Sequence, residues 1–236
     1  MNATLRALTL LTLLGALALS TGCADPALSQ ATRHEVGHTG ATHRSWLDVP
    51  AFQARLDHDS VDHARLAAAL YYATNEARVR LGRRALPREA LLEQASLLHS
   101  QRMTDHGFFD HTDPFSSSLR TPSDRARAVG VANPYTAENL VESPGFPYKS
   151  GQLVYPLGPP GRFSATPGGR AIPPHTYISF ARGAIKQWLD SPGHRKNLLS
   201  TDAVSVGCAA TLVWRDDFPT YNAVQLFQLY EPLKAE

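Results

Sequence analysis

Apolar residues in the middle of the chain recur at helical spacing and predict two long helices. The first is expected to begin after Ser60, as its N-cap, and to end at Gly82. Its apolar stripe consists of Leu66, Leu70, Ala73, Ala77 and Leu81. The second is expected to begin near Pro87 and to end at Gly107. Its buried face is expected to contain Leu91, Leu92, Ala95, Leu98 and Met103.

Shorter elements are predicted after these two helices. Thr121, as an N-cap followed by proline, predicts a short helix that ends at Gly130. Residues 135–141, which contain AENLV, predict a short strand. A further helix is expected over residues 177–190, and Ser191 followed by proline begins another helical turn.

The last part of the chain predicts an antiparallel β-hairpin. Apolar residues alternate over residues 204–214, the polar turn RDDFPT follows, and a second strand is expected over residues 221–230. Cys208 lies on the first of these strands and is expected to be buried there.

Residues 143–175 are rich in proline and glycine, a composition that excludes regular structure. Loops of this length within a compact domain are usually functional or disordered. Aromatic residues in the stretch favour a packed flap over a free coil. They are Phe146, Tyr148, Tyr155 and Phe163.

Residues 1–22 have the pattern of a signal peptide. Arg6 precedes an apolar run that is too short to span a bilayer as a permanent helix. Gly22 then precedes Cys23, the arrangement that bacterial lipoprotein processing requires before it acylates the cysteine. The alternative is ordinary cleavage at the earlier AxA sequence, which leaves Cys23 unmodified. The protein is therefore expected to be extracytoplasmic, as a membrane-anchored lipoprotein or in secreted form.

Residues 23–61 lack a sustained apolar period and predict a lipidated or flexible tether that contains several histidines. Within it, HEVGH at residues 34–38 matches the HExxH pattern of zinc peptidases. Gly37 interrupts the helix that this pattern needs, and Ala41 and Arg44 occupy the positions of the glycine and histidine in the extended pattern. Chance, or weak metal binding by a His-rich tether, is the preferred explanation.

Composition and charge limit the classes of function. The chain has 236 residues, of which 43% are hydrophobic and 19% charged, which fits one globular domain with appendages. It carries 23 basic and 21 acidic residues, and loss of the signal peptide removes Arg6 alone. So balanced a charge gives no electrostatic footprint for nucleic acid, and no such partner is expected. Two cysteines are too few for a disulfide framework.

Several motifs, taken in chain order, resemble a known family. They are TNEARVRLG, LLEQASLLHSQRMTDHGFFDHT, PSDRARAVG, AENL, AIKQWLDSPGHRKNLL and VGCAATL. Over about residues 62–230 the chain resembles the bacterial branch of the CAP superfamily, the SCP domain of cysteine-rich secretory, antigen 5 and pathogenesis-related proteins. The resemblance implies an α+β fold, an α-β-α sandwich with a small antiparallel sheet between helical layers. We therefore predict a CAP/SCP domain over residues 62–232 with a loop insertion at residues 143–175.

The resemblance also implies a cleft lined by two histidines and acidic residues. Carried over by motif, these are His111 of FFDHT, Glu138 of AENL and His194 of SPGHR. The place of the second glutamate in eukaryotic relatives holds Ser191 here, and Asp190 is adjacent, so Ser191 and Asp190 complete the candidate cleft residues.

Three features depart from the family pattern. Ala137 stands where the family usually has glycine before Glu138, and the bridging cysteines of eukaryotic relatives are absent. The loop at residues 143–175 is unusually long and can cover the cleft.

Two neutral imidazoles suit zinc or another divalent metal, so His111, His194 and Glu138 are candidate metal ligands. The carboxylate can complete the metal shell, orient a histidine or take a proton from bound water. The same residues also suit a purely structural role, as a hydrogen-bonded pair that holds two layers together. His99, beside the stripe of the second helix, is expected to be a core residue.

Two functions remain open for this cleft. The first is a cell-envelope binding module for a small apolar or cell-wall ligand, with membrane contact through a lipid anchor if Cys23 is acylated. The second is a metal-assisted, peptidase-like hydrolase. The sequence has no GxSxG motif and no other recognisable nucleophile arrangement, which favours binding and leaves enzymatic activity an open question.

Overall fold

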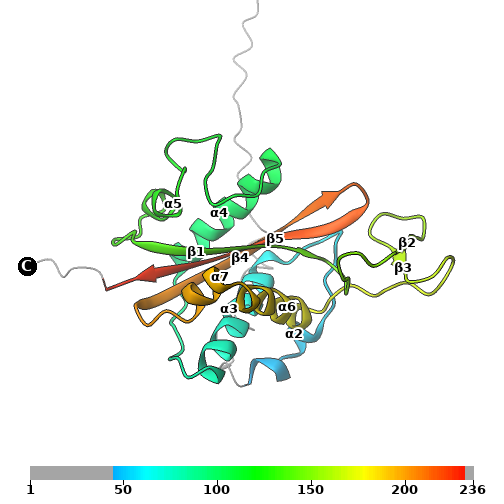
Figure 1. The fold of residues 1–236 in the computed structure, drawn as a ribbon, viewed down its shortest axis with the longest axis horizontal. Coiled ribbons are helices and arrows are strands. Elements are labelled where there is room, and N and C mark those ends of the chain that lie inside the picture. Colours follow the sequence, from blue (N-terminus) through cyan, green and yellow to red (C-terminus); the bar gives the residue numbers. More distant parts are fainter. Residues whose placement is uncertain (1–44, 232–236) are drawn as a thin grey trace, which may run out of the picture.

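Three antiparallel strands form the main sheet, in the spatial order β1-β5-β4 (Figure 1). The computed structural model describes residues 45–231. β4 (Ala203–Arg215) and β5 (Phe218–Leu229) form the hairpin that the alternating pattern predicts. β1 (Thr136–Pro144) pairs with the other side of β5. Within this sheet β5 is therefore the central strand and β1 is an edge strand.

Helices cover both faces of this sheet. In Figure 1, α4 (Ala90–His106) and α5 (Pro122–Ala128) lie on one side. On the other side lie α3 (His63–Arg80), α6 (Tyr177–Asp190) and α7 (Pro192–Leu198). The architecture is the predicted α-β-α sandwich of the α+β class, and the helix over residues 177–190 has the predicted bounds.

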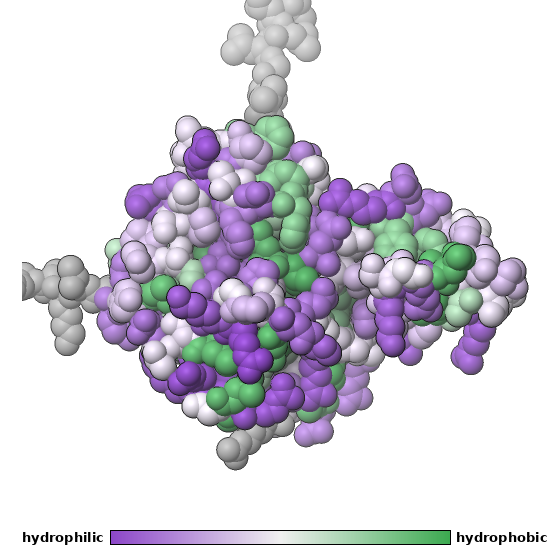
Figure 2. Space-filling model, viewed as in Figure 1, coloured by the Kyte–Doolittle hydropathy of each residue, from purple (hydrophilic) through white to green (hydrophobic). Residues whose placement is uncertain are grey.

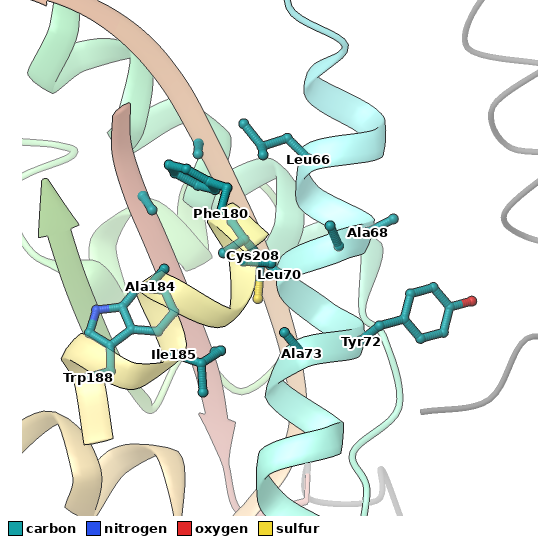
Figure 3. Close-up of a cluster of buried hydrophobic side chains, with 14 of the residues drawn as sticks. Leu66, Ala68, Leu70, Tyr72, Ala73, Phe180, Ala184, Ile185, Trp188 and Cys208 are labelled. Carbon is teal, nitrogen blue, oxygen red and sulfur yellow. The ribbon is translucent and has the colours of Figure 1, made fainter. Parts of the chain in front are cut away.

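The larger apolar core lies between the sheet and the layer of α3 and α6 (Figure 3). Its buried side chains include Leu66, Leu70, Ala73, Phe180, Ala184, Ile185 and Trp188. Cys208 of β4 is fully buried among them, as predicted. Burial of this continuous apolar surface is the main source of stability on this side of the sheet.

The folded domain begins earlier than the sequence predicted. A 3-10 turn, η1 (Trp46–Asp48), and the short helix α2 (Pro50–Gln53) precede α3. The Trp46 side chain is fully buried, and its ring stacks on that of Tyr72 with 6.1 Å between centroids. Residues 45–61, expected to be part of the tether, therefore belong to the domain. Isolated aromatic residues hold this segment against the core. Because its apolar residues do not recur at a regular spacing, the sequence pattern did not indicate that it is folded.

The first long helix begins two residues later than expected, because its N-cap is Asp62 and not Ser60. Asp62 Oδ1 accepts a hydrogen bond from the backbone N–H of Arg65 at 2.9 Å. The short helix α5 has the predicted cap: Thr121 and Asp124 form a reciprocal capping box.

The second long helix begins at Ala90 and not near Pro87, although it ends at Gly107 as predicted. The cause is a tertiary contact with β4. The Pro87 carbonyl accepts from the N–H of Val206 at 3.1 Å, and the N–H of Glu89 donates to the Val206 carbonyl at 3.1 Å. The chain therefore runs alongside β4 for one bridge before it turns into the helix.

Of residues 143–175, Ser143 and Pro144 end β1, and residues 145–175, called the flap below, project from one end of the sheet (Figure 1). Contrary to the expectation of no regular structure, β2 (Tyr155–Pro156) and β3 (Phe163–Ser164) pair within the flap. The prediction that its aromatics pack is confirmed, because the rings of Phe146 and Phe163 stack at 5.3 Å. Both rings also contact Phe218, at 4.9 and 5.3 Å. Phe218 starts β5 three residues earlier than expected.

Several predictions concern residues outside the described range. These are the signal peptide, the acylation of Cys23 and the HEVGH motif. Among the helices of residues 45–231, none has the length and apolar character needed to cross a membrane.

Candidate functional site

The predicted glutamate lies on edge strand β1, where its side chain is enclosed by charged and polar neighbours. Glu138 pairs in register with Leu226 of β5, and its side chain is 1% exposed. A buried carboxylate is unfavourable unless it is hydrogen-bonded and paired with an opposite charge. Arg125 of α5 supplies that partner, with 2.8 Å between its Nη2 and Glu138 Oε2.

Arg125 is itself completely buried and ties the loop that follows α4 to β1. Its guanidinium donates to the backbone carbonyls of Leu119 and Arg120, at 3.1 and 3.2 Å, and to the carbonyl of His111 at 3.1 Å. The planar, multidentate guanidinium suits such a role. Arg125 therefore fixes both the carboxylate and the backbone of the first histidine.

His111 stands on the carboxylate and faces outward. Its Nδ1 lies 2.8 Å from Glu138 Oε1, and its side chain is 49% exposed. Because an ionised carboxylate only accepts hydrogen bonds, Nδ1 carries the proton and Nε2 is left for other partners. The hydrogen bond to Glu138 raises the pKa of His111 above its ordinary value, against the opposing effect of partial burial.

His194, on α7, approaches His111 from the other helical layer. The centroids of the two rings are 6.4 Å apart. Burial, followed by the proximity of His111, lowers the pKa of His194 below its ordinary value. The two neighbouring imidazoles therefore have pKa values shifted in opposite directions.

Two asparagines hold α7 against β1. Asn139 Nδ2 donates to the His194 carbonyl at 3.0 Å. Asn197 Nδ2 donates to Asn139 Oδ1 at 3.0 Å and to the Glu138 carbonyl at 3.2 Å. These bonds fix the position of His194 relative to the strand that carries the glutamate.

His99 of α4 lies directly beside this site. It is fully buried, its Nε2 donates to the Asp110 carbonyl at 2.9 Å, and the same atom is 3.8 Å from Glu138 Oε1. Burial lowers the pKa of His99 to about 4, despite the nearby carboxylate, so it is neutral near pH 7. It is a hydrogen-bonded core residue, as predicted.

The other two candidate residues lie at the junction of α6 and α7. Asp190 is exposed and pairs with Lys186 at 2.5 Å. Ser191 is the N-cap residue of α7, but within residues 45–231 its side chain makes no capping hydrogen bond. The structure therefore places His111 against both Glu138 and His194, and it gives Ser191 and Asp190 local roles.

The family of the chain follows from a match that covers most of this domain. The model of the cysteine-rich secretory protein family, CAP, matches residues 71–227. The chain belongs to this family. No curated protein matches it.

Three solved structures of bacterial proteins match part of the chain. An extracellular SCP-domain protein of Bacillus anthracis is 21% identical with a TM-score of 0.47, over 72% of this chain and 41% of that one. An outer surface protein of Borrelia burgdorferi is 19% identical with a TM-score of 0.44, and the match covers 69% of this chain and 90% of that one. A cysteine-rich secretory protein of Staphylococcus aureus is 19% identical with a TM-score of 0.36, over 71% and 40%. The chain thus spans about two fifths of the Bacillus anthracis protein.

The donor set of this CAP domain fits a two-imidazole metal site better than a three-ligand one. Both oxygens of Glu138 are already engaged, one by His111 and one by Arg125. Among the described residues, no group of three or more His, Cys, Asp or Glu side chains is arranged to hold a metal ion. A metal at this place would be held by His111 and His194, and Glu138 would orient His111 beneath it.

Sequence reasoning missed Arg125, Asn139 and Asn197. Arg125 lies in the quoted motif PSDRARAVG, where an arginine on a short helix suggests an exposed side chain. Asn139 directly follows the glutamate in AENL, and Asn197 follows His194 by three residues in SPGHRKN. The only signal available was therefore proximity in sequence to the predicted site residues.

Proposed function

We propose that this CAP protein is an extracytoplasmic binding module whose His111–His194 pair holds zinc or another divalent transition metal. One observation carries the proposal. The buried Glu138–Arg125 pair fixes the half-exposed His111 through its Nδ1, and the centroid of the His111 ring lies 6.4 Å from that of His194. A carboxylate that orients a histidine in this way is typical of protein metal sites. Zinc bound there would supply a Lewis-acidic centre with open coordination positions.

The ligand of the module is proposed to be a small apolar or cell-wall-derived molecule. The two imidazoles belong to different helical layers, so such a ligand would bind where the layers meet at the edge strand. Glu138 is engaged by Arg125 and by His111, and Arg125 also donates to backbone carbonyls. We therefore assign them to holding His111 and not to direct contact with ligand.

Export supports a role in the cell envelope. The proposal combines the signal-peptide pattern of residues 1–22 with the descriptions of two structural relatives, an extracellular protein and an outer surface protein. Acylation of Cys23 would anchor the module to the membrane. Cys23→Ala should then release it from the membrane fraction, and a wild-type protein that is entirely soluble would contradict the anchor.

One observation favours hydrolysis as the second candidate function. His111 has a raised pKa and His194 a lowered one, and such pairs supply a general acid and a general base side by side. Cys208 is not available as a nucleophile, because it is fully buried and burial raises its pKa to about 12. Hydrolysis would therefore use water, and cleavage of a peptide library that His194→Ala abolishes would support it.

Zinc titration calorimetry on the mature chain tests the binding proposal. His111→Ala and His194→Ala should each abolish the binding event, and Glu138→Gln should weaken it about tenfold or more. Affinity should also fall as pH drops through the raised pKa of His111, because a protonated imidazole cannot bind metal.

The matched control is a chain in which His34, His38 and His43 are all alanine. It removes the tether histidines and should keep the binding event. If this control loses zinc binding while His111→Ala and His194→Ala keep it, the tether binds the metal and the proposal is wrong.

A further inference from the structure

A cavity of 340 Å³ lies between the flap and α6, where β1 ends. It is lined by Ser143 and Pro144 of β1, by Phe146 to Lys149 of the flap, and by α6. Strands rise about 3.3 Å per residue, so Ser143 is about 17 Å along β1 from Glu138. The cavity is therefore separate from the histidine pair.

Part of the wall of this cavity is apolar and held in place. Phe146 and Phe180 line it and are only 1% and 2% exposed. The base of the flap is tied to the sheet, because the N–H of Gly145 donates to the Pro219 carbonyl at 2.8 Å. The N–H of His175 in turn donates to the Gly145 carbonyl at 2.9 Å. A preformed apolar cavity of a few hundred Å³ is typical of small-molecule sites.

Gly183 of α6 leaves part of this space open. A Cβ placed on Gly183 would meet no heavy atom within 4 Å, so close packing does not require glycine at this position. Glycine within a helix is less stable than alanine. Gly183 lines the cavity, so the absence of a side chain there leaves the space open and makes the helix less stable.

The charge of the lining selects the kind of ligand. Among the described residues 45–231 that line the cavity, Lys149 carries the one ammonium or guanidinium group, and none is an aspartate or glutamate. Burial lowers the pKa of His175 to about 4, so its imidazole is neutral near pH 7. Gln187 and Ser143 hydrogen-bond to each other at 2.5 Å and add polar atoms to one wall.

We propose that this cavity is a binding site for a small amphipathic anion, whose apolar or aromatic body contacts Phe146 and Phe180 and whose acidic group meets Lys149. The flap supplies both the aromatic wall and the cation. Figure 2 shows apolar residues on the flap, and others lie near the middle of the same face. The site would thus give the insertion at residues 143–175 a function of its own.

The test compares two fluorescent probes that differ by one charge. The anion is 1-anilinonaphthalene-8-sulfonate, and N-phenyl-1-naphthylamine is the neutral molecule of the same ring system. The mature protein should bind the anion more tightly. Lys149→Gln should weaken binding of the anion about two- to fivefold and leave the neutral probe unchanged, as expected for one exposed charge contact.

Gly183→Leu fills the open space and should abolish binding of both probes, whereas Gly183→Ala should keep the fold and most of the binding. Lys186→Gln is the matched control, because Lys186 is a lysine on α6 that lines a different cavity, between α3 and α6. If Lys186→Gln weakens the anion and Lys149→Gln does not, the probe sits in that other cavity and the proposal is wrong. Failure of both probes to bind the folded wild type would also overturn it.

Discussion

The two faces of the sheet are built in different ways. The face towards α3 and α6 carries a continuous apolar core with large side chains such as Trp188 and Phe180. Among the described residues, the face towards α4 and α5 carries small apolar clusters together with the buried charges of Arg125 and Glu138. Apolar contacts are non-directional, whereas each buried charge depends on a specific partner.

This difference explains where the site lies. His111 comes from the polar layer and is held by Glu138, and His194 comes from α7 in the apolar layer. They meet at edge strand β1, where Asn139 contacts the backbone of His194. We infer that the apolar face supplies most of the folding stability. The buried charges of the polar face lower that stability and hold a histidine in a fixed orientation.

The largest effect is expected on the apolar face. Trp188→Ala should lower the free energy of unfolding by about 3–5 kcal/mol, because it leaves a cavity in the main core. Denaturant unfolding checks this value, and a loss below about 1 kcal/mol would show that the core of this face can collapse around the gap.

On the polar face, the free energy of unfolding should depend on whether each buried charge keeps its partner, and less on the volume of the side chains. Arg125→Met should lower the free energy of unfolding by about 3 kcal/mol, because it leaves Glu138 buried without its cation. The double variant Arg125→Met/Glu138→Leu should recover most of this loss. If the losses measured for Arg125→Met and Glu138→Leu alone simply add in the double variant, the buried pair does not behave as a unit. The proposed difference between the two faces would then be wrong.

Part of the pH dependence of stability should also come from the polar face. His99 has a folded-state pKa of about 4, so the unfolded chain binds its proton first as pH falls. Stability should therefore decline between about pH 6.5 and pH 4, by up to about 1.4 kcal/mol per pH unit. His99→Gln should remove that part of the slope. His175, near the flap, has a similar pKa of about 4, and His175→Gln measures its separate share.

The smallest effect is expected at a helix end. Asp62 caps α3 through the N–H of Arg65. Asp62→Ala should lower the free energy of unfolding by about 1 kcal/mol. Ser60→Ala is the matched control and should change it little, because Ser60 is not the cap. Equal effects of the two substitutions would contradict the assigned start of α3.

Local patterns predicted the long elements well because their signals are local. The bounds of α6 and the presence of the β4–β5 hairpin follow from the spacing of apolar residues. The start of α4 was wrong because a backbone bridge to Val206, distant in sequence, delays the helix. The anchor at Trp46 was missed because one aromatic residue has no period.

The site was predictable only in part. His111, Glu138 and His194 were found through the motifs of the family, and the structure brings them together. Arg125 was not found, because its burial depends on the tertiary contact with Glu138 and an arginine on a short helix reads as exposed. Local sequence gives no sign of such a contact.

The central claim is that the hydrogen bond to Glu138 holds His111 beside His194. Its most direct test is an NMR titration of the His111 and His194 imidazoles in the wild type and in Glu138→Gln. We predict that His111 titrates above its ordinary value of 6.5 and His194 below it, and that Glu138→Gln lowers the pKa of His111. If both histidines titrate near 6.5 and Glu138→Gln leaves them unchanged, Glu138 does not hold His111 and the proposed site is wrong.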